Sequence, residues 1–447
     1  MAAASLSVLS SGLKVVAGKI MDISMFGNKL WNSIRDKAGE PTNIKQEGNA
    51  FYYYRNAKTS NGDNSGALAE GGTFGTYDPT LGVTMKWPMV TVASMLQVTE
   101  TAIRAGGILG PDDTVDMKNF QMQGLMADWG LKMARQISGQ AKGWLTTIRE
   151  GTSGTTIKVM DTDLIRKGNR IYAYDVSSDT WTKDASAFTS GEGVVTAVNH
   201  QALTITVDAN SHALTAGQYI VPAGQYGICL NGIGDILAHG AENITVGNYV
   251  VRRLLDSYGN QLRSSYPALE APLSWVSAAN TPADFTSAAL FEWIADMAAS
   301  QDGQMCGATD VFGHPHTLIS VWNAIAQLRT MGIKDNRVEY GSKGECTFSH
   351  PTLRDGTVTI KGMGGWKKYI LDAFDFSDKE NSKMRWDAPP HWVETDETGG
   401  IFRYDGGPGK THTRSGIYNV LVGMPWNPAV CGTLAGIQLP SSGKQVA

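Results

Sequence analysis

The chain has 447 residues, which is enough for two or three compact units, each with its own core. With 42% hydrophobic and 18% charged residues, it is too apolar and too weakly charged to be disordered. A net charge of −4 argues against a protein that grips DNA through a basic surface. The 51 glycines favour strands and long turns whose surface is partly buried against copies of the same chain.

Cysteine usage and hydropathy indicate a protein made and used inside the cell. No C-x-x-C pair occurs, so we expect free thiols rather than a disulfide framework or a structural zinc site. No apolar run approaches the ~20 residues that span a bilayer, and the N-terminus lacks the basic region of a secretory signal. The cysteines are Cys229, Cys306, Cys346 and Cys431.

The first 99 residues predict an arm followed by an extended flap. Residues 1–48 form the arm, in which Gly12 to Ala38 has helical apolar spacing, either as a solvated helix or as an arm across neighbouring subunits. Residues 49–99 form the flap, with strands at Ala50–Arg55 and Val83–Thr99. The glycine-, asparagine- and serine-rich stretch between them is long for a compact domain, so we expect it to reach another molecule.

A long helix dominates the predicted unit 100–154. Pro111 and the acidic residues after it are start signals, and Ser138-Gly139 is the expected end. Such a helix of about 26 residues spans ~40 Å and should pack against a sheet, rather than form a cofactor box. Its apolar stripe contains Met122, Met126, Trp129, Met133 and Ile137.

Residues 155–240 change to short alternating strands, which predict an inserted β-domain built as a small barrel or sandwich. The expected strands are Thr156–Met160, Arg170–Tyr174, Gly193–Val198, Leu203–Val207 and Gln218–Pro222.

The remaining units are 241–380, 381–420 and 421–447, which together with the rest predict an α+β fold. A helix with Pro282 at its first position runs to Ser300, and a second covers Thr317–Met331. The expected strands are Thr309–Gly313, Val358–Lys361, Tyr369–Asp372, Lys383–Trp386, Ile401–Tyr404 and Tyr418–Met424.

Two motifs suggest chemistry at first sight. Gly409-Lys410-Thr411 resembles the end of a phosphate-binding loop, but the required first glycine position is Tyr404, so a hairpin turn is expected. His314 and His316 flank a proline, and His350 has no ligand spacing to them. Zinc needs three or four ligands, so we predict paired loop histidines and no metal.

Three weaker patterns also lack a catalytic arrangement. The segment 362–365 is a glycine-rich turn, and the segment 151–154 is not a nucleophile elbow because Thr155 replaces the required glycine. Asp161 and Asp163, with Lys158 and Arg166 nearby, predict a solvated strand end. We therefore predict no catalytic, cofactor-binding or metal-binding residues, no cofactor, and no enzymatic activity.

The order of pieces carries a resemblance to a known family. Arm, flap, long helix, inserted β-domain, helix–strand–helix unit and returning strands follow one another along nearly the whole chain. This order resembles the Hong Kong 97-like major capsid proteins of tailed double-stranded-DNA bacteriophages. The segments similar to that family are Asn49–Thr99 and the helix after it, then Gly356–Gly362, Lys367–Ala373, Met384–Trp386, Ile401–Gly406 and Val420–Ile437.

The resemblance implies a structural role. In that family, residues 49–99 would be the E-loop, 100–154 and 381–420 the peripheral domain with its spine helix, and 241–380 with 421–447 the axial domain. Subunits would form hexamers and pentamers of an icosahedral shell around packaged double-stranded DNA, assembled in the host bacterial cytoplasm without a membrane. The implied partners are copies of the chain, a scaffolding protein, a portal and a cement or decoration protein. Lys58 is the single lysine near the flap tip, and no acceptor motif for cross-linking it is present.

Three alternatives stay open from the sequence. An encapsulin-type nanocompartment shares the fold but is usually shorter and lacks the inserted β-domain. A β-rich enzyme with its site in the inserted domain would bind a small molecule and form a discrete oligomer. A tail or portal-associated protein would form tubes or rings.

Overall fold

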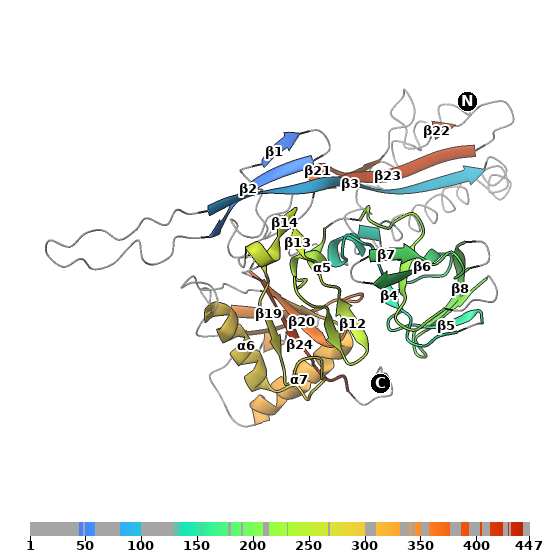
Figure 1. The fold of residues 1–447 in the computed structure, drawn as a ribbon. Helices are drawn as coiled ribbons and strands as arrows, with labels where there is room; N and C mark the ends of the chain where they lie inside the picture. Colours follow the sequence, from blue (N-terminus) through green and yellow to red (C-terminus); the bar gives the residue numbers. More distant parts are fainter. Residues whose placement is uncertain are drawn as a thin grey trace, which may run out of the picture.

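A computed structural model defines the fold of this chain (Figure 1). The described residues are 44–47, 50–58, 81–99, 129, 132–133, 135–152, 154–177, 180–188, 191–208, 214–229, 231–266, 269–299, 310–330, 339–340, 345–349, 357–375, 386–392, 403–404, 412–422, 428 and 431–440. The predicted arm helix, the tip of the flap and most of the predicted long helix lie outside these residues.

A mixed sheet of seven strands forms the centre of the molecule, which we call the body. β15 is parallel to β24, β16 is parallel to β19, and the other neighbours are antiparallel. The strand order is β15 (Leu273–Trp275), β24 (Cys431–Ala435), β20 (Ile370–Phe374), β16 (Asp310–Gly313), β19 (Thr357–Gly362), β18 (Glu345–Ser349) and β17 (Glu339–Tyr340).

Two helices, α6 (Ser287–Ala299) and α7 (Pro315–Thr330), pack their apolar sides into one core with this sheet. Trp293 and Met297 of α6 and Val321 of α7 are buried against the strands. Helix α6 begins five residues after the predicted Pro282, because the Thr286 hydroxyl accepts the Ala289 N–H and caps the helix. The predicted helix–strand–helix unit is otherwise confirmed.

The second core of the body contains the described end of the long helix. Trp129, Met133 and Ile137 are buried there, so the predicted apolar stripe is confirmed for these residues, while Met122 and Met126 lie outside the described part. The same core includes residues of α5 (Ile233–Ile236) and of the hairpins β11 (Ile244–Val246)–β12 (Tyr249–Arg252) and β13 (Ser257–Tyr258)–β14 (Gln261–Leu262); the 3₁₀ turn η2 (Arg263–Ser265) follows β14.

The predicted inserted β-domain is a closed barrel at the right of Figure 1. Its strand order is β4 (Thr146–Thr147), β10 (Tyr219–Pro222), β6 (Arg170–Ser177), β8 (Gly193–Asn199), β9 (Thr204–Val207) and β5 (Thr156–Lys158), with β7 (Thr180–Lys183) beside β6. An antiparallel bridge between Ile148 and Val159 joins the two ends of this order, so the sheet closes on itself. Alternating side chains fill the interior, including Ile157, Ile171 and Ile205.

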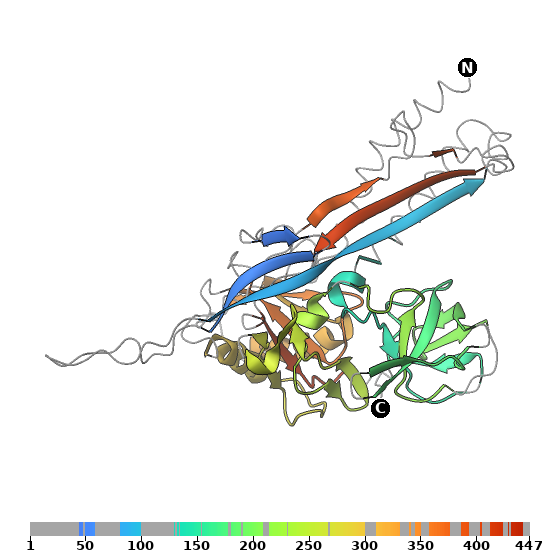
Figure 2. The same cartoon turned by 45° about the horizontal axis from the view of Figure 1, so that its top comes forward.

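A long sheet runs along one side of the molecule (Figures 1 and 2). Its order is β1 (Ile44–Glu47), β2 (Ala50–Lys58), β3 (Leu81–Thr99), β23 (His412–Val422) and β21 (Trp386–Trp392), with β22 (Arg403–Tyr404) beside β23. The predicted pairing of the two flap strands is confirmed between Ala50–Lys58 and Leu81–Pro88. Beyond Pro88, β3 pairs with β23 instead, so the flap is part of a sheet rather than an isolated two-stranded ribbon.

One strand of this sheet continues beyond its predicted end. We predicted Lys383–Trp386; residues 383–385 lie outside the described part, and β21 covers Trp386–Trp392 and includes Pro389 and Pro390. Proline cannot donate a ladder hydrogen bond and is tolerated at a sheet edge. β21 occupies such an edge, where its prolines also discourage pairing with a further strand.

The base of β3 anchors the long sheet to the body. Val83, Met85 and Trp87 alternate into the core, and Trp87 meets Tyr258 edge to face with ring centroids 5.6 Å apart. The Lys86 N–H donates to the Gly259 carbonyl at 2.9 Å. Gly259 has φ +57°, and a Cβ there would lie 2.7 Å from that of Met85, so only glycine permits this approach.

Candidate functional site

The contact between barrel and body, which we call the seam, concentrates buried polar side chains from distant parts of the chain. The segment Asp161–Asp163 leaves the barrel after β5 and meets the body. Asp163 Oδ2 lies 2.6 Å from Nε2 of His314, which follows β16. Asp161 accepts from Lys368 Nζ at 3.4 Å and from the Tyr249 hydroxyl at 3.3 Å.

The start of α7 fixes the orientation of His314. Its Nδ1 accepts the backbone N–H of His316 at 3.1 Å, which leaves Nε2 as the donor to Asp163. Burial raises the pKa of Asp163, but the hydrogen bond from His314, with the charge of Lys368, outweighs burial and holds that pKa well below its ordinary value. Asp163 is therefore an ionised acceptor in the seam.

This arrangement corrects two predictions. Asp161 is buried rather than a solvated strand end, and Asp163 is half-buried. Their side-chain partners Tyr249, His314 and Lys368 lie more than 80 positions away, which sequence spacing cannot reveal. The histidines are not both in a loop, because α7 begins at Pro315 and includes His316. Their ring centroids are 4.9 Å apart.

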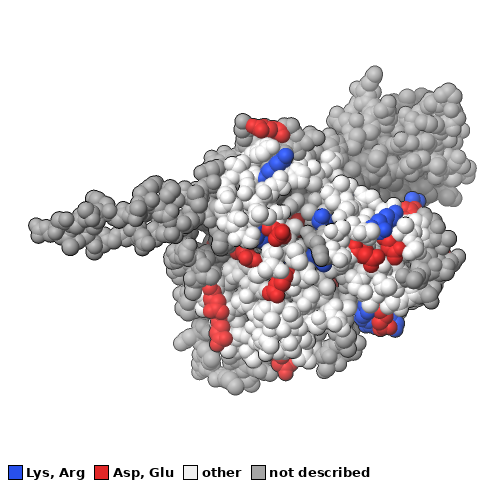
Figure 3. Space-filling model, viewed as in Figure 1, with Lys and Arg blue, Asp and Glu red and all other residues white. Residues whose placement is uncertain are grey.

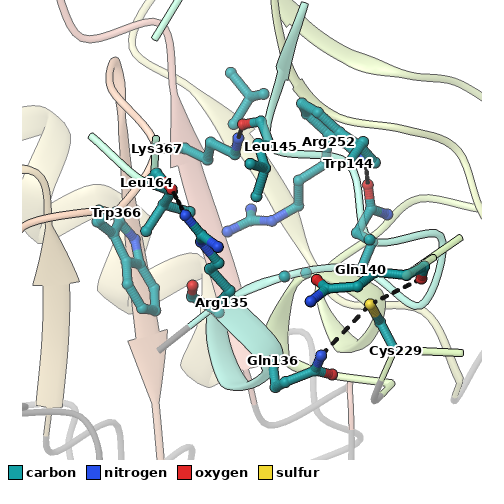
Figure 4. A pocket seen from close by; sticks show the side chains of 17 residues that line it. Arg135, Gln136, Gln140, Trp144, Leu145, Leu164, Cys229, Arg252, Trp366 and Lys367 are labelled. Atoms are coloured by element: carbon teal, nitrogen blue, oxygen red, sulfur yellow. Dashed lines mark hydrogen bonds between the residues drawn. The ribbon is translucent and has the colours of Figure 1, made fainter. Parts of the chain in front are cut away.

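A small cavity of about 30 Å³ lies at the seam beside the end of the long helix (Figure 4). That volume suits one or two water molecules. Arg135 donates to the Leu164 carbonyl and to Asn169, while Lys367 donates to the Leu145 carbonyl at 3.0 Å. Desolvation lowers the pKa of Lys367 to about 8. Arg135 and Lys367 thus donate to barrel carbonyls and tie the two units together.

Behind the cavity, a fully buried ionic network connects three elements of the body. Arg252 on β12 pairs with Asp372 on β20 and donates to the Thr433 hydroxyl on β24 at 2.8 Å. Asp372 also accepts from the Trp366 indole at 2.8 Å and from Thr433 at 2.7 Å. Sequence reasoning missed this network, although a charged residue inside the apolar runs YVVR and ILDAF is a signal for a buried partner.

Asp235 in α5 is a second buried carboxylate near the barrel. Its Oδ2 accepts the Ala141 N–H at 2.8 Å, and its carbonyl accepts from Arg263. Burial raises its pKa to about 7, despite that hydrogen bond and the charge of Arg263. A Cβ at Gly232 would lie 2.5 Å from the Gln136 carbonyl oxygen, so glycine allows this segment to sit directly against the end of the long helix.

The other predicted motifs are turns or lie outside the described residues. The segment 362–365 is a turn after β19, in which Gly365 has φ +83°. The phosphate-loop-like Gly409-Lys410-Thr411, His350 and Cys306 lie outside the described residues, whereas Cys346 lies in β18. Cys229 and Cys431 are buried and form no disulfide, and burial raises the pKa of the Cys229 thiol.

The polar side chains of the seam hold the barrel against the body. Its carboxylates pair with cations, tyrosine or backbone groups of the same chain. Among the described residues, no group of three or more His, Cys, Asp or Glu side chains could hold a metal ion. No helix within the described ranges is long and apolar enough to cross a membrane.

Comparisons with known proteins find solved structures that resemble this chain, but no relatives by sequence. No protein-family model matches the chain, and no curated protein matches it. The capsid asymmetric unit of Cyanophage A-1(L) matches with 8% identity over 90% of this chain and 92% of the other, with a TM-score of 0.48. The capsid of a native GTA particle matches with 11% identity over 91% and 90%, with a TM-score of 0.42.

A third solved structure, the capsid of Myoviridae Phage XM1, matches with 10% identity over 90% of this chain and 91% of the other, with a TM-score of 0.38. Each match spans nearly the whole of both chains. All three TM-scores lie below 0.5, so the function of this chain has to be argued from its own architecture.

Proposed function

We propose that this chain is a shell-forming structural subunit, the major capsid protein of a tailed bacteriophage. The observation that carries the proposal is the long sheet. β3 has 19 residues, which corresponds to ~60 Å of extended chain, and Val83, Met85 and Trp87 near its start are buried in the core of the body. A sheet of that length held to the body at its base suits contacts between copies.

The barrel supports a structural role over a catalytic one. Its interior is filled by isoleucine, valine and phenylalanine, and Ile157, Ile171 and Ile220 have no exposed surface. A filled barrel of this size leaves no interior site for a small molecule. The alternative of an enzyme with its site inside the inserted domain therefore has no supporting observation.

In the proposed assembly, hexamers and pentamers of this subunit close into an icosahedral shell around double-stranded DNA. We propose residues 241–380 and 421–447 as the axial unit around each symmetry axis. The long sheet and the long helix would form the flat part of the shell. Scaffold, portal and cement proteins would be partners, with assembly in the host cytoplasm.

The test is assembly of the expressed protein, observed by negative-stain electron microscopy and sedimentation velocity. We expect round shells, or sheets and tubes of hexamers. Deleting residues 60–75 from the flap should leave a folded subunit but reduce the thermal stability of closed particles. A protein that stays a monomer or dimer, also when its candidate scaffold is co-expressed, would overturn the proposal.

A further inference from the structure

The outer face of the barrel carries a continuous cluster of aromatic rings. On β6 and β10, Ile171, Ala173 and Ile220 point inward, while the tyrosines alternating with them point outward. Tyr174 and Tyr226 stack with centroids 4.7 Å apart. We call this set the aromatic–cationic face, and it consists of Trp144, Tyr172, Tyr174, Trp181, Tyr219 and Tyr226 with the cations Lys142, Lys183 and Arg253.

The cations of this face lie over the rings. Lys183 Nζ is 3.5 Å from the centroid of Tyr172, and Lys142 Nζ is 5.6 Å from that of Tyr226. Arg253 lies 5.8 Å from the centroid of Trp181. Of the carboxylates beside these rings, Asp184 is engaged by Ser186 and Gln218, and Asp175 on β6 is exposed. Trp144, Tyr174 and Tyr219 are themselves buried, so they form the base of the face. Its accessible part consists of the half-buried rings Tyr172, Trp181 and Tyr226 with the cations Lys142 and Lys183.

An exposed apolar side chain follows the rings along the chain. Ile228, two residues after Tyr226, exposes 63% of its surface. Aromatic residues are enriched in protein–protein interfaces, where they supply large contact area. Base stacking on nucleic acid is disfavoured here, because Tyr174 and Tyr226 already stack on each other, and Lys142 and Lys183 lie over the rings of Tyr226 and Tyr172.

The opposite side of the molecule has the complementary charge. In and just before α6, exposed positions recur every four residues at Asp284, Ala288, Glu292 and Asp296. The helix SAALFEWIADMAA contains no lysine or arginine. Acidic atoms gather at the left of the face in Figure 3, over the position of α6 in Figure 1. We call this stripe the acidic face; α7 beside it exposes 41% of Ile319.

Figures 1 and 2 both place α6 and the barrel at opposite ends of the molecule. We propose that the aromatic–cationic face of one copy docks on the acidic face of a second copy. Two different faces of one chain give a head-to-tail contact, which closes into a ring when the rotation between copies closes. Complementary charge fixes the register and suppresses wrong pairings. This inference rests on the proposed shell function and names one of its contacts.

Charge reversal on each face tests the contact. The first variant is K142E with K183E, and the second is E292K with D296K. Each alone should lose particle assembly, while a chain with all four substitutions should regain it, because the reversed charges again complement each other. The matched control is K167E, an exposed lysine in the turn before β6, which should assemble like the unmodified chain.

Thermal unfolding of each variant as a free subunit checks that it folds, and carbodiimide cross-linking of unmodified particles supplies a test without substitutions. We expect amide links between peptides containing Lys142 or Lys183 and peptides containing Glu292 or Asp296. If both two-residue variants assemble normally, or if folded variants fail and the four-residue variant does not recover, this contact is wrong while the shell function stands. If the unmodified chain forms no particles, the proposed function itself fails.

Discussion

The barrel and the body each contain a seven-stranded sheet, but the two are built differently. The barrel takes its strands from one continuous segment, 146–222, and its interior is apolar. The body sheet collects strands from Leu273 to Ala435 and places the last of them, β24, between β15 and β20. Its interior includes the ionic network of Arg252 and Asp372.

This difference in strand connectivity indicates the order in which the two units can fold. A closed sheet from contiguous strands needs few long loops, so the barrel can form from local contacts. The body sheet cannot be completed before its C-terminal strand arrives, and its buried charges must meet in register across 120 residues. We therefore expect the body to be the less tolerant unit, and the barrel to fold independently of it.

The largest expected effect is in the body. Arg252→Met should leave Asp372 as a buried, uncompensated charge and cost about 3–5 kcal/mol of unfolding free energy. Hydrogen exchange should rise in β20 and β24 but stay unchanged in β8 and β9. The control is R252M combined with D372N, which removes the stranded charge and should recover part of the loss. Equal exchange in both units after R252M would contradict the independence of the barrel.

A cavity in the barrel should give the reverse pattern. Ile205 has no exposed surface, and Ile205→Ala should cost about 2–5 kcal/mol through lost burial and the cavity left behind. Faster hydrogen exchange should be confined to the barrel strands. Ile319→Ala, at an exposed position of α7, serves as the control and should change stability little. Destabilisation of β20 by I205A would show that the two units unfold together.

A smaller effect on stability is expected at Asp235, which lies between the barrel and the body. Its pKa is raised from 3.8 to about 7 by burial, so between these values the folded protein binds a proton that the unfolded chain has lost. Stability therefore falls as pH rises through this interval and levels off above it. Asp235→Asn keeps an acceptor for the Ala141 N–H and cannot ionise. We expect it to be more stable than the unmodified chain at about pH 8, on the order of 2–3 kcal/mol.

Denaturant unfolding at about pH 5 and about pH 8 measures this difference, and the advantage of the asparagine variant should shrink at the lower pH. Glu242→Gln provides a control, because that carboxyl is exposed. An asparagine variant with the same pH dependence as the unmodified chain would show that Asp235 does not govern it.

The sequence by itself determined the local elements of this protein. Alternation of apolar and polar residues predicted the barrel strands, and the apolar stripe predicted the burial of Trp129, Met133 and Ile137, because these patterns follow directly from strand and helix periodicity. The domain boundaries inferred from the resemblance, and the arm helix, stay predictions.

Only the tertiary structure decided which strands meet and which charges are buried. The switch of β3 from β2 to β23 at Pro88 joins segments more than 300 residues apart. Asp163 and His314, separated by 151 positions, form a hydrogen bond that no local pattern predicts. Periodicity predicts which face of an element is buried. The partner of that face depends on how the elements pack against one another, and this packing produces the seam and the two complementary faces.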